Sequence, residues 1–279
     1  MKTSTQLKAK ARNLAAKTNT PPHIIQRNYF LERFLERVSL SGYKDSIVLK
    51  GGVLITSLLG IEARVTVDLD ATMRARGLSA DEITGIVGEV LRTPVDDSVI
   101  FTLTGIEETR VEAEYPGFRV TLGVTLDKLC DTVKIDFTAG DVITPEPMEY
   151  GYRLMFEDRE IRVLAYNIET VLAEKFTALL SLDVANTRMK DYYDIHMLLT
   201  EQREAIGPDV FMEAVNNTAK QRGMSRLIPQ AEHIVDTIAE SSAMAELWKR
   251  YQTVYKYAAG VEYNAVIIGL RLLCKWCNP

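Results

Sequence analysis

The sequence predicts an α+β protein in which a mixed sheet with flanking helices is followed by a helical C-terminal lobe. Strand-like segments are frequent up to about residue 165, whereas helical periodicity continues from there nearly to the C-terminus. We therefore expect a core at 1–165, which begins with helices, and a helical lobe at 166–279. No low-complexity linker separates the two parts, so we expect them to pack closely and to form a substrate cleft. With 47% hydrophobic residues, a chain of 279 residues can bury a sizeable core.

The first elements of the core read as a strand, a glycine turn and a short helix, at one end of a βαβ hairpin. The β-branched and apolar run 46–49 ends at two glycines, and the apolar positions of 53–59 fit a helix that the next glycine ends. Glycines let the backbone approach a ligand, and a helix N-terminus offers free amides and positive dipole character to an anion. A triphosphate suits this turn. The predicted nucleotide-binding residues here are Lys50, Gly51 and Gly52.

Two carboxylates follow on the next predicted strand, 65–70. Strand alternation places Asp68 and Asp70 on one face, about 7 Å apart along the chain. Magnesium is usually held by one or two carboxylates plus substrate phosphates, and two such ions can clamp an in-line displacement. A third acid, Asp136, lies on another alternating strand and is the candidate to join them. We expect Mg²⁺ or Mn²⁺ at Asp68, Asp70 and Asp136, with an NTP as substrate.

The remaining elements are predicted from the same two periodicities. A helix is expected at 79–91, behind the carboxylate strand. Further strands are expected at 99–103, 118–126, 132–138 and 152–156. The lobe is expected to contain helices at 168–182, 190–200, 208–220, 225–240, 242–257 and 262–276.

The order of these motifs carries more information than any one of them. A glycine pair alone is usually a turn, and an Asp-x-Asp alone is usually solvated. Together with a later strand aspartate, in this order and on compatible elements, they resemble the polymerase-beta-like nucleotidyltransferase superfamily. The resemblance implies a nucleotidyltransferase core whose three carboxylates hold metal ions.

A second group of residues narrows the family. The helical segment 173–180 carries Lys175, and 188–199 follows with the sequence Asp191-Tyr-Tyr-Asp194. Over roughly residues 48–199 the chain resembles the AbiEii/AbiGii toxin family of nucleotidyltransferases. The resemblance implies that Lys175 contacts the nucleotide phosphates and that Asp191 or Asp194, contributed by the helical lobe, completes the catalytic site. One position departs from the superfamily, because Val53 stands where Ser or Thr usually follows the glycines.

The resemblance also implies a biological role. It implies the toxin of a bacterial toxin–antitoxin system active in phage defence, with an antitoxin protein as partner. The enzyme would move a nucleoside monophosphate from an NTP to RNA, at the 3′ end of tRNA, and so block translation. Two alternatives remain: a catalytically weak nucleotide-binding protein, favoured by Val53, and a metal-dependent phosphodiesterase, which has less need of a glycine loop.

The second group of residues has a purely structural alternative as well. Lys175 is then a solvated helix residue, and Asp191 and Asp194 form surface ion pairs with nearby cations. Tyr192 and Tyr193 are expected to pack in the lobe and not to stack on bases. The isolated Cys-x-x-Cys near the C-terminus is expected to be two ordinary thiols, since zinc needs four ligands.

Charge and composition limit the partners. A net charge of -5 argues against a protein that coats nucleic acid through its whole surface. The N-terminal segment is locally basic, and it either steers RNA or is simply a solvated arm. Its cations, which precede the first acidic residue Glu32, are Lys2, Lys8, Lys10, Arg12, Lys17 and Arg27. With three cysteines, no membrane-spanning run and no secretion segment, we expect a cytoplasmic protein without a disulfide framework or membrane partner.

Overall fold

The structure, a computed structural model, describes residues 1–74, 78–109 and 117–277. The chain divides into two compact units, and each is described by itself. The first unit comprises Met1–Asp141 and Met148–Ala165, and the second comprises Val142–Pro147 and Tyr166–Pro279. The short segment Val142–Pro147 therefore belongs to the second unit, although it precedes the last two strands of the first.

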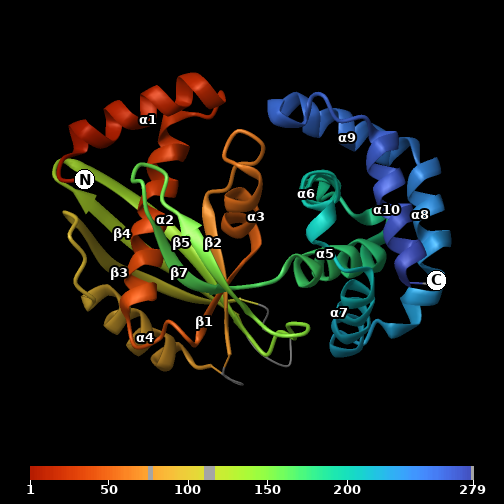
Figure 1. Cartoon of the computed structure of the whole chain (residues 1–279), viewed down its shortest axis with the longest axis horizontal. Coiled ribbons are helices and arrows are strands. Elements are labelled where there is room, and N and C mark those ends of the chain that lie inside the picture. The colour runs from red at the N-terminus through yellow and green to blue at the C-terminus, as the bar shows by residue number, and fades with distance from the viewer. Residues whose placement is uncertain (75–77, 110–116, 278–279) are drawn as a thin grey trace. The chain divides into compact units, whose positions relative to one another are not determined.

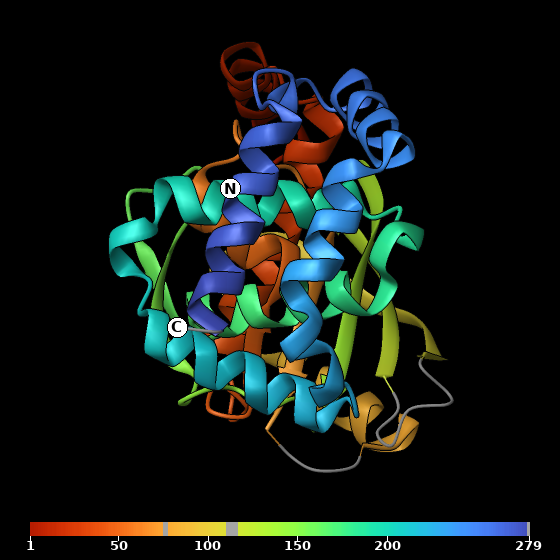
Figure 2. The same cartoon turned by 90° about the vertical axis from the view of Figure 1, so that its right-hand side faces the viewer.

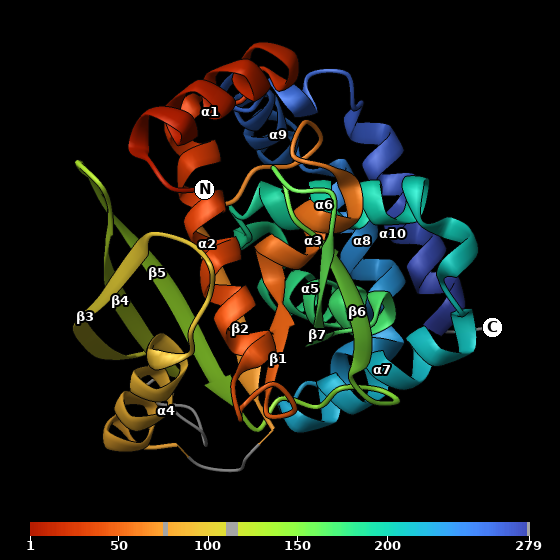
Figure 3. The ribbon, with the colours of Figure 1, turned by 60° about the vertical axis from the view of Figure 1, so that its left-hand side comes forward.

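The first unit is a mixed seven-stranded sheet with helices (Figure 1). Its elements are α1 (Ser4–Thr18), α2 (Pro22–Leu40), β1 (Ile47–Lys50), α3 (Gly51–Leu59), β2 (Asp68–Met73), α4 (Ala80–Arg92), β3 (Val99–Thr109), β4 (Gly117–Leu126), β5 (Leu129–Ala139), β6 (Met148–Arg153) and β7 (Glu160–Ala165). The strand order is β3-β4-β5-β2-β1-β7-β6, and Figure 3 shows the strands in this sequence. Only the β2–β5 and β1–β7 pairs are parallel among the described strands. The predicted α+β fold with a mixed sheet is confirmed.

The two faces of this sheet differ in polarity. Along β4, Phe118 and Val120 are buried, whereas Arg119 between them is partly exposed. On the apolar face, Phe34 of α2 packs edge to face against Phe101 of β3, with ring centroids 6.4 Å apart. Because successive strand residues point to opposite faces, the polar face collects Arg119 of β4, Lys134 and Asp136 of β5, and Asp68 and Asp70 of β2. Asp131, near the start of β5, lies on the other face, where it pairs with Arg27 of α2 at 3.0 Å.

The glycine turn opens a helix, as predicted, but the strand that follows begins later than expected. β1 and β2 pair antiparallel, so α3 closes a hairpin between adjacent strands. The predicted strand 65–70 starts only at Asp68. Thr66, in the part of the predicted strand that is not a strand, bonds to a helix: the side-chain amide of Asn28 on α2 donates to its carbonyl at 2.9 Å. Thr66 is thus tied to α2, just before β2 begins.

The strand predicted at 152–156 was wrong in its position. β6 ends at Arg153, and β7 was not predicted. The backbone N–H of Met155 donates to the two carboxylate oxygens of Glu32, at 3.0 and 3.2 Å. Met155 therefore bonds to this side chain and not to a neighbouring strand. Burial raises the pKa of Glu32 to about 8, although this contact with Met155 lowers it. The turn thus depends on a distant buried acid.

The second unit is helical (Figure 2). Its α-helices are α5 (Ile168–Leu182), α6 (Met189–Glu201), α7 (Pro208–Gln221), α8 (Ala231–Glu240), α9 (Ser242–Val254) and α10 (Tyr263–Cys277). Four short 3₁₀ segments join them: η1 (Asp183–Ala185), η2 (Arg203–Ala205), η3 (Ser225–Gln230) and η4 (Lys256–Ala258). The predicted helix 225–240 is split into η3 and α8, because Pro229 has no backbone N–H for a continuous ladder. In the part of the chain that the structure describes, no helix is both long and apolar enough to cross a bilayer.

Candidate active site

The glycine turn lies directly against Asp70. Gly51 has a φ of +63°, and a Cβ built on it would lie 2.1 Å from Asp70 Oδ2. The backbone N–H of Gly52 donates to the same oxygen at 3.1 Å. No side chain fits between the turn and the carboxylate, so these positions require glycine for space as well as for backbone conformation.

Two further residues, which were not predicted, support the turn from its other side. A Cβ on Gly52 would lie 2.4 Å from Thr66 Oγ1 and 2.8 Å from Arg64 Nη1. Arg64 is 2% exposed and donates to the Gly52 carbonyl at 3.2 Å. A signal was present in the sequence, because Arg64 and Thr66 continue the every-second-residue spacing of Asp68 and Asp70.

A row of charged residues crosses five strands at the level of Asp70. The register pairs Glu107 with Arg119, Arg119 with Asp136, Asp136 with Asp70, and Asp70 with Lys50. Directly paired residues share one face of a sheet, and like charges placed opposite each other are destabilising. The only like-charged neighbours in this row are Asp136 and Asp70, at its centre. The three acids predicted to bind metal thus share one face, as expected.

The electrostatics of this face suit a cation. Burial and the charge of Asp136 raise the pKa of Asp68, with a smaller contribution from Asp70, while Arg119 acts in the opposite direction. Asp68 is half-buried, so water screens this repulsion only in part. Carboxylate oxygens are the donors that Mg²⁺ and Mn²⁺ prefer. The chemistry and the crowding of these acids therefore fit a divalent metal ion.

Asp136 is engaged by an arginine that the sequence did not predict as part of the site. Arg119 Nε and Nη2 donate to Asp136 Oδ1 and Oδ2 at 2.8 and 2.7 Å. Across residues 1–74, 78–109 and 117–277, no three Asp, Glu, His or Cys side chains are arranged to hold a metal ion. Both carboxylate oxygens of Asp136 face the guanidinium. Arg119 thus takes one acceptor site on each oxygen of Asp136 and competes with a metal ion for this carboxylate.

Lys50, predicted to bind nucleotide, makes a buried ion pair. Its Nζ lies 2.7 Å from Asp141 Oδ2, with side-chain exposures of 8% and 9%. Thr138 donates to the same oxygen at 2.5 Å. Burial raises the pKa of Asp141, but the charge and hydrogen bond of Lys50, together with the hydrogen bonds of Thr138 and Thr72, outweigh burial and lower this pKa to about 2. The pair anchors the strand end just before the glycine turn, and contact of Lys50 with a nucleotide stays a prediction.

The second unit brings the other three predicted residues into one cluster. Lys175 Nζ on α5 lies 2.6 Å from Asp191 Oδ1 and 2.8 Å from Asp194 Oδ2, both on α6. The two acids are three residues apart and so share a helix face. Side-chain exposures of 15% for Lys175, 9% for Asp191 and 0% for Asp194 contradict the alternative of a solvated surface pair. Tyr192 and Tyr193 are buried, as expected of packing residues.

A comparison with protein-family models decides the family. Residues 33–260 match the model of the AbiEii nucleotidyl transferase toxins of type IV toxin–antitoxin systems. The chain belongs to the AbiEii nucleotidyltransferase toxin family. The match spans most of both units, and it confirms the family resemblance seen in the sequence. Membership also implies an NTP as substrate and an antitoxin as partner.

Solved structures agree with the fold of an AbiEii-family protein. The nucleotidyltransferase toxin MenT4 from Mycobacterium tuberculosis has a TM-score of 0.58 and 16% identity, covering 95% of this chain and 98% of its own. A proposed nucleotidyltransferase from H. pylori has a TM-score of 0.51 and 12% identity, covering 92% and 97% respectively. A search of curated proteins gave no significant match. At these identities the structures support the fold alone.

One position of this AbiEii-family chain departs from the wider superfamily, as the sequence indicated. Val53 follows the glycine pair and is 1% exposed in α3. Its side chain is part of the core, so it provides neither a hydroxyl group nor contact with solvent. The groups that this turn can offer to a phosphate are therefore its backbone amides.

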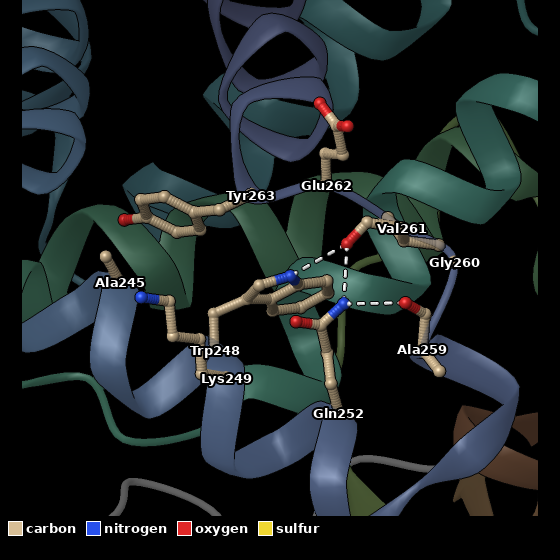
Figure 4. Close-up of a pocket in the computed structure, with 9 residues that line it drawn as sticks. All are labelled: Ala245, Trp248, Lys249, Gln252, Ala259, Gly260, Val261, Glu262 and Tyr263. Atoms are coloured by element: carbon tan, nitrogen blue, oxygen red, sulfur yellow. Dashed lines mark hydrogen bonds between the residues drawn. The ribbon is translucent and has the colours of Figure 1, made fainter.

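The helical unit also contains a hollow of about 350 Å³ (Figure 4). It is lined by Ala245, Trp248, Lys249, Gln252, Ala259, Gly260, Val261, Glu262 and Tyr263. The indole N–H of Trp248 and the side-chain amide of Gln252 both donate to the Val261 carbonyl at 2.9 Å. These polar groups bond within the protein and fix the loop before α10. None of the predicted site residues lines this hollow.

The Cys-x-x-Cys pair lies on the last described helix. Cys274 and Cys277 are free thiols on α10, and Cys274 is buried. Burial raises the pKa of Cys274 to about 12, so its reactive thiolate form is disfavoured. This agrees with the expectation of two ordinary thiols.

Proposed function

We propose that this AbiEii-family chain is a metal-dependent nucleotidyltransferase that moves a nucleoside monophosphate from an NTP to RNA. The acceptor is the 3′ end of a tRNA, and its modification blocks translation. The observation that carries the proposal is the contact of the glycine turn with Asp70, on the face that also holds Asp68 and Asp136. A phosphate-binding turn and a metal-binding carboxylate thus adjoin each other.

The site residues of the first unit have distinct roles in the transfer. The amides of Gly51 and Gly52, at the start of α3, bind the triphosphate. Asp68, Asp70 and Asp136 would hold Mg²⁺ or Mn²⁺, and the bound ion would supply positive charge to the reacting phosphates. Asp136 also takes the proton of the attacking hydroxyl. The hydroxyl oxygen bonds to the α-phosphorus as the bond to pyrophosphate breaks.

The residues of the second unit serve the leaving group. Phosphoryl chemistry needs cations that neutralise charge on the triphosphate as pyrophosphate departs. We assign that role to Lys175, whose ammonium Asp191 and Asp194 hold in place. Asp194 is fully buried, so it supports the lysine from within, whereas Asp191 lies nearer the surface. In this proposal Lys175 is therefore the residue of the cluster that contacts the triphosphate, and the two acids hold it in place.

Incubation with labelled NTP, magnesium and total RNA separates the candidate functions. Extended, labelled RNA supports nucleotidyl transfer. Shortened RNA would instead indicate a metal-dependent phosphodiesterase, and tightly bound but unconsumed NTP would indicate a nucleotide-binding protein.

Gly51→Ala is expected to abolish NTP binding, because the added Cβ would occupy the position of Asp70 Oδ2. Gly223→Ala is a matched control, since Gly223 has nearly the same φ, +66°, but nothing within 4 Å of its Cβ. Both substitutions carry the left-handed backbone cost of roughly 1–2 kcal/mol. Urea unfolding and NTP binding by calorimetry check the pair. Equal NTP affinities in the two variants would show that the turn does not bind phosphate.

Neutralising Lys8, Lys10 and Arg12 together is expected to weaken RNA binding. These exposed cations lie on α1, which has no acidic residue. Each lost phosphate contact lowers the slope of log affinity against log salt by about 0.7–0.9. RNA affinity is measured across a salt series, and NTP affinity should not change. A control variant neutralises three exposed cations elsewhere in the same unit: Lys44, Lys128 and Arg162.

If the α1 variant and the control have equal salt slopes and affinities, α1 does not touch RNA. Antitoxin binding would then be the role to test for this helix.

A further inference from the structure

We propose that Arg119 is a further functional residue of the transfer site, which holds Asp136 before substrate binds and then moves its guanidinium to the triphosphate. This inference rests on the proposed function. In the resting state Arg119 occupies the carboxylate. In the loaded state Arg119 would release Asp136, which would then be able to hold a metal ion, and the guanidinium would bind phosphate oxygens.

The geometry of the pair makes such an exchange possible. Arg119 contacts Asp136 through two parallel hydrogen bonds, from Nε at 2.8 Å and from Nη2 at 2.7 Å. This fork matches the oxygens of a phosphate as well as those of a carboxylate. The same donors therefore serve both partners without any change in their own arrangement.

The charges of the row explain why the resting state needs Arg119. Asp136 lies directly beside Asp70 in the parallel register, and Asp68 is two residues away on the same face. The positive charge of Arg119 offsets this repulsion, and its influence extends to Asp68, where it lowers the pKa. A metal ion supplies the same compensation once it binds. Arg119 and the metal are thus alternative partners of Asp136.

Arg119 is placed to leave and to reach the turn. Its side chain is 36% exposed, so it can rotate without unpacking the core. It lies on β4, two strands from β2, and neighbouring strands are about 4.8 Å apart. On β2, Asp70 contacts the Gly52 amide at 3.1 Å. Two strand spacings amount to about 10 Å, so the guanidinium can meet a phosphate group of a triphosphate that extends from the turn across β2 towards β5.

The experiment measures Mn²⁺ binding to the full chain by electron paramagnetic resonance, first without nucleotide and then with a non-hydrolysable NTP analogue. Arg119→Met should tighten Mn²⁺ binding about tenfold without nucleotide, because the metal no longer competes for Asp136. The same variant should weaken binding of the analogue in the presence of Mn²⁺ by about tenfold or more. Arg119→Lys should change both affinities less, since an ammonium keeps the charge but loses the fork.

A structural salt bridge would not produce these two opposite changes. Arg162→Met is the control, because Arg162 also lies on a strand and pairs with an acid, Glu149, at 3.5 Å. It should alter neither affinity. Circular dichroism and urea unfolding verify that each variant is folded. If Arg119→Met does not fold, the two affinities of Arg119→Lys test the inference instead.

Two results would overturn the inference. One is an unchanged or weaker Mn²⁺ affinity in Arg119→Met, and the other is an unchanged affinity for the analogue. If the wild-type chain binds neither Mn²⁺ nor the analogue, it is the proposed function itself that fails. Asp136→Asn separates the two cases further, because it should weaken Mn²⁺ binding and remove any effect of Arg119→Met.

Discussion

Asp70→Ala is expected to abolish nucleotidyl transfer and cellular toxicity while the fold stays intact. Asp70 joins the two parts of the first unit's site, since it accepts the Gly52 N–H at 3.1 Å and pairs with Asp136 in the sheet. Loss of one such charge-organising group lowers the rate by roughly a hundred- to a thousandfold. Removing one of two repelling carboxylates should change the free energy of unfolding little.

Product formation from labelled NTP and the urea midpoint check this expectation together. Asp158→Ala provides the control, because Asp158 is a fully exposed acid in the same unit. Asp68→Ala should behave like Asp70→Ala. Wild-type activity in the Asp70→Ala protein would exclude the proposed metal site.

Lys175→Ala should weaken transfer at least about a hundredfold, the effect of removing one preorganised charge-stabilising group. The substitution also leaves the fully buried Asp194 without this cation, 2.8 Å away in the native protein. Loss of one partner of a buried pair destabilises a fold by roughly 3–5 kcal/mol. A drop in activity alone would therefore not separate catalysis from folding.

The double variant Lys175→Ala/Asp194→Asn makes that separation. It removes the buried charge together with its partner, so its urea midpoint should recover towards that of the wild type. Transfer should stay at the level of Lys175→Ala, measured over a full NTP titration. Recovery of activity along with stability would show that Lys175 is a structural residue.

Most helices of the second unit were predictable from sequence because their signals are local, although the helix predicted at 225–240 is split and that predicted at 242–257 ends at Val254. The helix predicted at 168–182 is observed as α5 (Ile168–Leu182), where Asn167 caps the first turn through the Thr170 N–H. The strands of the sheet were harder to predict from the sequence. β7 was missed, and β6 was misplaced, because the turn after it is fixed by Glu32, 123 residues away from Met155.

In the site, too, local features were predictable and long-range contacts were not. Asp68 and Asp70 could be placed on one face from strand alternation alone. Their surroundings could not be, since Arg119 lies 17 residues from Asp136, and Asp141 lies 91 residues from Lys50. Partners of this kind are chosen by strand register, which one sequence does not encode in any short pattern.

The burial of the cluster of Lys175, Asp191 and Asp194 also could not be predicted from the sequence. Two acids three residues apart on a helix, next to cations, fit a surface ion pair equally well. Only the packing of α5 against α6 shows that Asp194 is buried and faces Lys175.

The central claim is tested most directly by mass spectrometry of tRNA 3′ ends after incubation with each NTP and Mg²⁺. The proposed activity predicts a mass increase of one or more nucleoside monophosphates, with release of pyrophosphate and no increase for the Asp70→Ala protein. Unchanged or shortened tRNA, under conditions in which the wild-type protein binds NTP, would contradict nucleotidyl transfer to tRNA.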